Sequence, residues 1–190
     1  MKVLQSTLLI FFAITFLSCG NQPQTDLGNN EIKPFVPTNV IVGTKKDVTI
    51  DKVFNFINSF DHEVKHITST IFSSPLAADS LNYIVDFLNT KPYVKEEEGW
   101  PVKGYIHYQT GAITITPRFF DMHDRNYQTD WLETMEKFNF SEPKTPTSGY
   151  VLLLLVPEGQ EKTWVNTFSD HELLEWAELN HIRDIEFGNN

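Results

Sequence analysis

The sequence has little cysteine and little positive charge, and each scarcity excludes a class of protein. One cysteine among 190 residues cannot form an internal disulfide framework or a Cys-rich metal site. Fifteen Lys and Arg residues stand against 25 Asp and Glu residues, which gives a formal net charge of -10. Non-specific nucleic-acid binding needs clustered positive charge, so we expect no nucleic-acid partner. The sequence also has no Gly-rich phosphate loop and no G-x-S-x-G nucleophile motif.

A largely apolar run occupies the start of the chain. The first two residues supply one positive charge, and residues 3–17 carry none. The run is shorter than the roughly 20 residues that span a bilayer, and it fits a secretory signal peptide. It ends in Ser18-Cys19-Gly20, which resembles a bacterial lipobox. The resemblance implies cleavage before Cys19, acylation of that cysteine and attachment of the mature chain to a membrane.

The segment after Cys19 is rich in Asn, Gln, Pro and Gly and has no apolar periodicity. This composition is typical of a flexible tether. We therefore predict a signal peptide at 1–18, a lipidated Cys and tether at 19–39, and a single domain at 40–190. Gly20 does not resemble the Asp that retains enteric lipoproteins at the inner membrane. The following residues do not resemble the acidic run of surface-directed lipoproteins, so an outer-membrane location facing the periplasm is favoured.

Helix-like and strand-like patterns alternate along the predicted domain. The apolar run YVLLLLV at residues 150–156 predicts a strand that is buried on both faces. The interleaved elements predict an α+β fold, and a ferredoxin-like sandwich, with a mixed or antiparallel sheet and helices on one face, is our first choice. The predicted strands are 40–42, 67–72, 102–109, 112–117, 150–156 and 173–179. The predicted helices are 80–88, 130–140, a short one around Trp164, and one after Thr49 with apolar positions at Val53, Phe56, Ile57, Phe60, Val64 and Ile67.

The residues His62-Glu63-Val64-Lys65-His66 spell H-E-x-x-H on the predicted helix. Two histidines four residues apart on a helix can hold one zinc ion while the glutamate activates its bound water. Lys65 places a charge inside the motif, and the helical phase directs both imidazoles toward solvent, opposite the apolar stripe. The motif therefore has two interpretations, a metal site with His62 and His66 as ligands and Glu63 as catalytic base, or a solvated polar face.

Two further groups of residues have both a functional and a structural interpretation. Asp121-Met122-His123-Asp124-Arg125 could supply a base, or a third metal ligand from Asp121 or His123. The same composition is typical of a loop that precedes a helix. The second group is aromatic and could form a ligand platform or belong to the core. It consists of Trp100, Tyr105, Tyr108, Phe119 and Phe120, with Lys103 and His107 on the same hairpin.

Residues 150–182 resemble the second half of subtilisin-type propeptides. The resemblance lies in Val156-Pro157-Glu158-Gly159, in a short helix with Trp164, and in the stretch EWAELN at 175–180. Those propeptides have a ferredoxin-like fold and inhibit or chaperone a protease, and their C-terminal tail enters its active site. The resemblance implies the same fold here and makes the tail at 181–190 the inhibitory segment. No protease domain follows, and the predicted helix at 80–88 has no counterpart in the family.

Taken together, these observations predict a lipid-anchored accessory or binding module of the bacterial envelope without catalytic activity. Its expected partners are the membrane, through Cys19, and another envelope protein. The alternatives are a zinc-dependent hydrolase that uses His62, Glu63 and His66, and a protease-inhibitor-like domain. We expect no cofactor, with zinc as the alternative.

Overall fold

The computed structural model describes residues 34–60, 62–94, 100–144 and 146–182. They belong to one compact unit that begins at Lys33. The expected signal peptide, Cys19 and the tether up to residue 33 lie outside the described residues, as do residues 183–190. Within the described ranges, no helix is both long enough and apolar enough to cross a bilayer.

Five strands form an antiparallel sheet in the order β6-β2-β7-β1-β8. Helix α1 (Ile50–Ser59) connects β1 to β2, and α4 (Glu161–Ser169) connects β7 to β8. The interleaved order β2-β7-β1-β8 of these two strand–helix–strand units is the ferredoxin-like arrangement. The predicted α+β fold is therefore confirmed. The strands are β1 Phe35–Thr44, β2 Val64–Thr68, β6 Phe119–Phe120, β7 Val151–Leu155 and β8 Leu174–His181.

The chain between β2 and β7 builds a second antiparallel sheet in the order β3-β5-β4. Ser73 of β3 pairs with Thr114 of β5 and also forms a bridge with Ser141. The order β4-β5-β3-Ser141, with α2 and α3 as connections, repeats the ferredoxin-like pattern inside the first one. The elements are β3 Phe72–Ser74, α2 Leu81–Leu88, β4 Lys103–Ile106, β5 Ile113–Thr116 and α3 Arg125–Phe138, with 3₁₀ turns at Ala78–Ser80 and Pro92–Val94.

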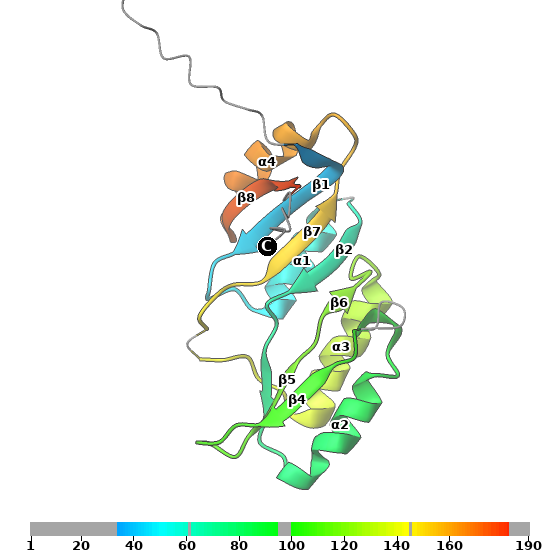
Figure 1. Ribbon diagram of the computed structural model, residues 1–190, viewed down its shortest axis with the longest axis vertical. Helices are drawn as coiled ribbons and strands as arrows, with labels where there is room; N and C mark the ends of the chain where they lie inside the picture. The colour runs from blue at the N-terminus through cyan, green and yellow to red at the C-terminus, as the bar shows by residue number, and fades with distance from the viewer. Residues whose placement is uncertain (1–33, 61, 95–99, 145, 183–190) are drawn as a thin grey trace, which may run out of the picture. The chain divides into compact units, whose positions relative to one another are not determined.

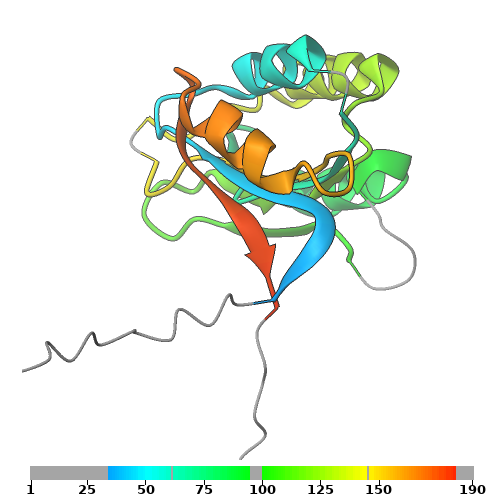
Figure 2. The ribbon, with the colours of Figure 1, turned by 90° about the horizontal axis from the view of Figure 1, so that it is seen from above.

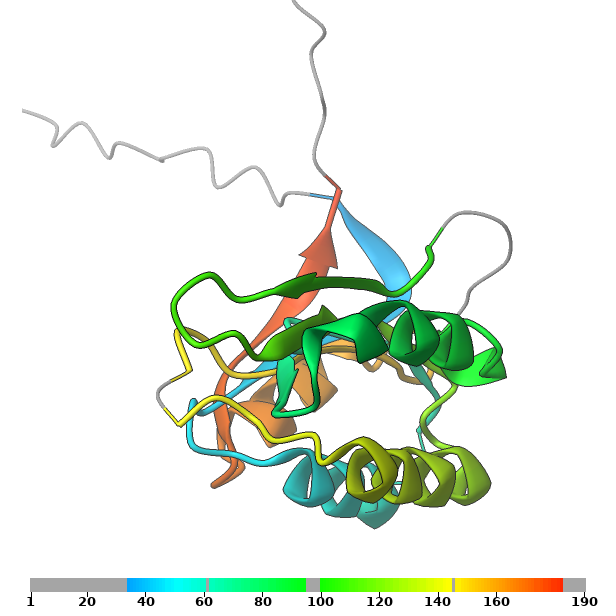
Figure 3. The ribbon, with the colours of Figure 1, turned by 90° about the horizontal axis from the view of Figure 1, so that it is seen from below.

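The core lies between the sheets and the helices. Figure 1 looks onto the strands with α1 and α3 behind them, and Figures 2 and 3 show these two helices side by side. Their contact includes a reciprocal amide pair, in which Asn58 and Gln128 donate to each other at 2.9 and 3.0 Å. Trp131 of α3 is fully buried, with its ring centroid 4.6 Å from that of Phe119 and 5.0 Å from that of Phe72. One continuous apolar core thus supports both sheets.

The predicted helix after Thr49 is wrong in its second half. Helix α1 ends at Ser59, and the chain is extended as strand β2 from Val64. A β-bulge between Val64 and His66 shifts the register against β7, so Val64 and Ile67 both point into the core although they are three residues apart. This spacing imitates the helical period. The H-E-x-x-H residues consequently do not lie on a helix.

Two predicted boundaries also change. Strand β1 begins at Phe35, so the last residues of the predicted tether, 35–39, belong to the sheet. Helix α3 begins at Arg125, five residues before the predicted start, because Asp124 caps it by accepting the Asn126 backbone N–H at 2.8 Å. The helix at 80–88, the hairpin around Gly111 (φ +70°) and the elements of the last forty residues are confirmed.

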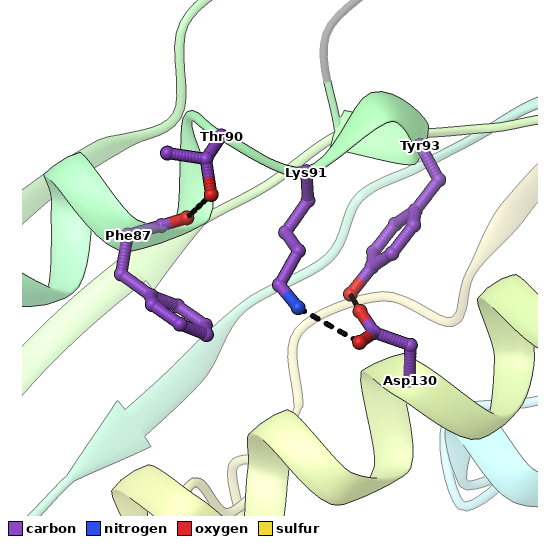
Figure 4. A network of polar contacts seen from close by, with 5 residues as sticks. All are labelled: Phe87, Thr90, Lys91, Tyr93 and Asp130. Atoms are coloured by element: carbon purple, nitrogen blue, oxygen red, sulfur yellow. Dashed lines mark hydrogen bonds and ion pairs between the residues drawn. The ribbon is translucent and has the colours of Figure 1, made fainter.

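A polar network joins α3 to the segment that follows α2 (Figure 4). The Asp130 carboxylate accepts the Tyr93 hydroxyl at 2.6 Å and pairs with the Lys91 ammonium at 2.8 Å. Burial opposes ionisation of Asp130, but the hydrogen bonds from Lys91 and Tyr93 outweigh it and lower the pKa of the carboxyl. Burial and the neighbouring carboxylate raise the pKa of Tyr93, so its hydroxyl remains a donor.

We expect Tyr93→Phe to lower the free energy of unfolding by about 1–3 kcal/mol near neutral pH, because a charged acceptor loses a buried donor. The lowered pKa of Asp130 contributes stability above the ordinary value of 3.8, and this contribution is lost as pH falls through the pKa of the folded state. The cost of the substitution should therefore shrink in acid. Urea unfolding across this range checks it, with Tyr108→Phe, at an 87% exposed side chain, as the control. A pH-independent cost would contradict the assignment.

Candidate functional site

The strand register aligns one side chain from every strand of the five-stranded sheet, on the face opposite the helices. Phe120 pairs with His66, His66 with Leu153, and Leu153 with Ile41, which pairs with Glu178. Phe120 and Leu153 are buried but are not part of the continuous core. These five residues form the first row of the face.

A second row runs beside the first and ends on an exposed indole. Thr68 pairs with Val151, Val151 with Gly43, and Gly43 with Trp176. Trp176 lies directly over Gly43, where a β-carbon would come within 2.2 Å of the indole. The absence of a side chain at residue 43 thus lets the indole lie flat on the sheet, with 39% of Trp176 still exposed. We call the two rows, together with Arg118 and Trp100, the open face.

Arg118 and Trp100 close the β6 end of the open face. The Arg118 guanidinium lies 4.8 Å from the Trp100 ring and 5.5 Å from the Phe120 ring, within cation–π range. The Arg118 Nε is buried and has no hydrogen-bond partner among the described residues. A buried donor without an acceptor is costly, so this guanidinium is suited to donate hydrogen bonds to a carboxylate from outside.

Charge is separated across the open face. Arg118 and Lys65 lie at its β6–β2 side, and Glu178 lies at the β8 edge beyond the apolar centre. Burial, followed by the positive charges of Arg118 and Lys65, lowers the pKa of His66 to about 4. The imidazole is therefore neutral at physiological pH and adds a weakly polar surface to the centre.

The structure separates the two histidines of the H-E-x-x-H sequence. His62 lies on the helix side of the sheet, stacked on Phe60 and 4.2 Å from the Trp164 ring. His66 lies on the open face beside Phe120. A cleft of about 250 Å³ brings His62 and Glu63 together with His123, the residue suggested as a third ligand. No group of three His, Cys, Asp or Glu side chains able to hold a metal occurs in the described ranges.

Some residues of the other predicted groups have structural roles, and others are exposed on the surface. Asp124 caps α3, and Asp121 accepts the Asp124 N–H in the preceding turn, so this cluster is a helix-start loop. Phe119 is fully buried in the core, whereas Trp100, Tyr105 and Tyr108 are 55, 51 and 87% exposed. Sequence reasoning did not identify Trp176 or Arg118. The sequence does contain a signal for Trp176, because a large aromatic residue stands beside Glu175 and Ala177 on a predicted strand.

A pocket of about 370 Å³ lies at the start of α1. Among its lining residues is Glu142, whose carboxylate accepts the Ile50 backbone N–H at 2.8 Å and also the Tyr150 hydroxyl. Burial and Glu142 raise the pKa of Tyr150, which keeps the hydroxyl protonated. These contacts cap a helix and attach the 142–150 segment to it.

Comparisons with protein-family models, with curated proteins and with solved structures found no match to this chain. On the open face, the Trp176 and Trp100 side chains remain 39 and 55% exposed.

We expect Gly43→Ala to cost about 1–3 kcal/mol of unfolding free energy, because the new methyl displaces the Trp176 indole. In a Trp176→Ala background the same change should be neutral or stabilising, since alanine restricts the unfolded chain more than glycine does. Urea unfolding of the four proteins in this cycle measures the coupling. An equal cost in both backgrounds would show that the indole does not lie on Gly43.

Proposed function

We propose that this protein is a lipid-anchored, non-catalytic binding module of the bacterial envelope and that the open face is its binding surface. The observation that carries the proposal is the composition of this face. Leu153 and Ile41, with the Trp176 indole lying over Gly43, form an apolar surface that no described helix covers, between a basic side and an acidic edge. An apolar patch with a polar rim is the pattern of a protein-binding surface.

Four described residues with catalytic potential are engaged in structural contacts, which supports binding over catalysis. Glu142 caps α1, Asp124 caps α3, and Asp130 holds Lys91 and Tyr93. His62 packs among aromatic rings.

The lipobox resemblance at Cys19 supports attachment to a membrane, and Gly20 favours the outer membrane with the domain facing the periplasm. One acyl chain contributes about 0.8 kcal/mol for each buried methylene, and stable attachment needs a second chain or signal. Attachment restricts the module to partners in the same envelope layer.

We expect a photoreactive benzoylphenylalanine that replaces Trp176 in the full chain to form a covalent adduct with a protein in living cells, because the indole stands at the exposed edge of the open face. The same amino acid in place of Glu133, exposed on α3, is the matched control. Cys19→Ser should release the chain from the membrane fraction and weaken the adduct. Equal adducts at both positions, or none at residue 176, would contradict the proposal.

A protease inhibitor is the second candidate, and it is supported by the ferredoxin-like order of β2, β7, β1 and β8 that the propeptide resemblance implies. In that case the tail after β8 enters a protease active site. Deletion of residues 182–190 should then abolish inhibition of a subtilisin-type protease, measured as an inhibition constant. An unchanged constant, or no inhibition by the intact chain, would remove this candidate.

A further inference from the structure

We infer that the open face binds a second copy of this chain, so that the protein forms a face-to-face dimer. This inference rests on the proposed function, because it names the occupant of the same surface. The inference is based on the separation of charge across the face. The face has a basic side, an apolar centre and an acidic edge, and this pattern is complementary to itself.

The strand order places the basic side and the acidic edge on opposite sides of the central strand β7. Strands β6 and β2 lie on one side of the central strand β7, and β1 and β8 lie on the other. A half-turn about an axis along β7 stacks two open faces and places β8 of each copy over β6 of the other. Every contact between residues i and j then occurs twice, as in any isologous dimer. Leu153, on the axis, faces its own counterpart.

The half-turn brings opposite charges together. Glu178 of one copy meets the end of the face where Arg118 and Lys65 lie in the other. Arg118, whose buried Nε has no acceptor among the described residues, gains a carboxylate, and its guanidinium can also stack on the facing Trp176. Ile41 meets the neutral imidazole of His66. The apolar centre therefore contains no unpaired charge.

The alternative stacking is disfavoured by the same charges. A half-turn about an axis across the strands would place Glu178 against the Glu178 of the second copy, and would place the two Arg118 side chains together. Like charges in contact across an interface cost several kcal/mol. Of these two arrangements, the charge pattern favours the first, in which strands of the two sheets run in similar directions, as in aligned sheet packing.

The size of the face indicates a dimer that depends on the membrane. Its five strands span four spacings of about 4.8 Å, or roughly 19 Å. Such an interface falls at the small end of the range for stable complexes. Attachment of both copies to one membrane raises their effective concentration without any new contact. We therefore expect association on the membrane to exceed association of released chains.

The test uses the full chain in its membrane, with a single added cysteine and a short bismaleimide. Facing sheets pack about 10 Å apart, beyond the reach of a direct disulfide. Leu153→Cys should give a covalent dimer, whereas Glu133→Cys on α3 and the parent chain should not. Because Leu153 is 7% exposed and its loss can destabilise the fold, a second pair is used. Chains with Ile41→Cys and chains with His66→Cys should cross-link more when they are expressed together than when each is expressed alone.

Charge reversal decides whether the proposed arrangement is correct. In the Leu153→Cys chain, Glu178→Arg and Arg118→Glu should each reduce the cross-linked fraction about tenfold, because each places like charges in contact. The double reversal should restore it. Glu133→Lys, on the helix side, should have no effect. Cross-linking that survives both single reversals, or a double reversal that restores nothing, would overturn the arrangement.

The outcome also separates this inference from the proposed function. If neither cysteine pair cross-links but a photoreactive residue at position 176 forms an adduct with a different protein, the open face is a binding surface and the second-copy inference is wrong. If neither experiment yields an adduct, both are wrong. Adducts of twice the chain mass in the two experiments support both.

Discussion

The pairing of β7 with both β1 and β2 is the contact on which the rest of the structure depends. Strand β7 comes late in the chain but lies at the centre of the five-stranded sheet, so both halves of that sheet are incomplete without it. Its alternate residues serve opposite faces: Leu152 and Leu154 enter the core, and Leu153 enters the open face. Because β7 is separated from β2 by about eighty residues, its docking closes a long loop, and such contacts are costly to form.

The long segment between β2 and β7 is tolerated because it is a folded unit with its own sheet. Strand β3 follows β2 along the chain, and β5 precedes β6. The same two chain segments therefore pair twice, as β2 with β6 and as β3 with β5. The two ladders separate where Ser69 adopts a positive φ of 60° and Pro117 interrupts the opposite strand. There the Thr70 hydroxyl donates to the Pro117 carbonyl and satisfies a buried group that the broken ladder leaves. The junction thus lets one continuous core support two sheets.

The sequence pattern predicted most local elements and the α+β class of the fold, but not the surface that distant strands build together. The run at 150–156 identified the central strand β7, in which Leu152, Leu153 and Leu154 are all buried although Leu153 lies on the open face. The pattern at 64–67 predicted a helix where the chain forms strand β2, because a bulge gave the strand the apolar spacing of a helix. The open face could not be predicted, since its first row draws on five strands distant in the chain. The prediction of Cys19 as an anchor concerns a local motif and stays a prediction.

The position of β1 has a mechanical consequence. Its first residues lie beside the end of β8, where the Ile182 N–H donates to the Pro34 carbonyl at 2.9 Å, and β1 pairs with β7 on its other side. If the chain is anchored at Cys19, as proposed, tension on the anchor reaches the domain through the start of this strand. A load along the strand shears two hydrogen-bond ladders at once, so their bonds share the force instead of breaking one after another. The domain would therefore resist unfolding under such a load more strongly than its modest size suggests.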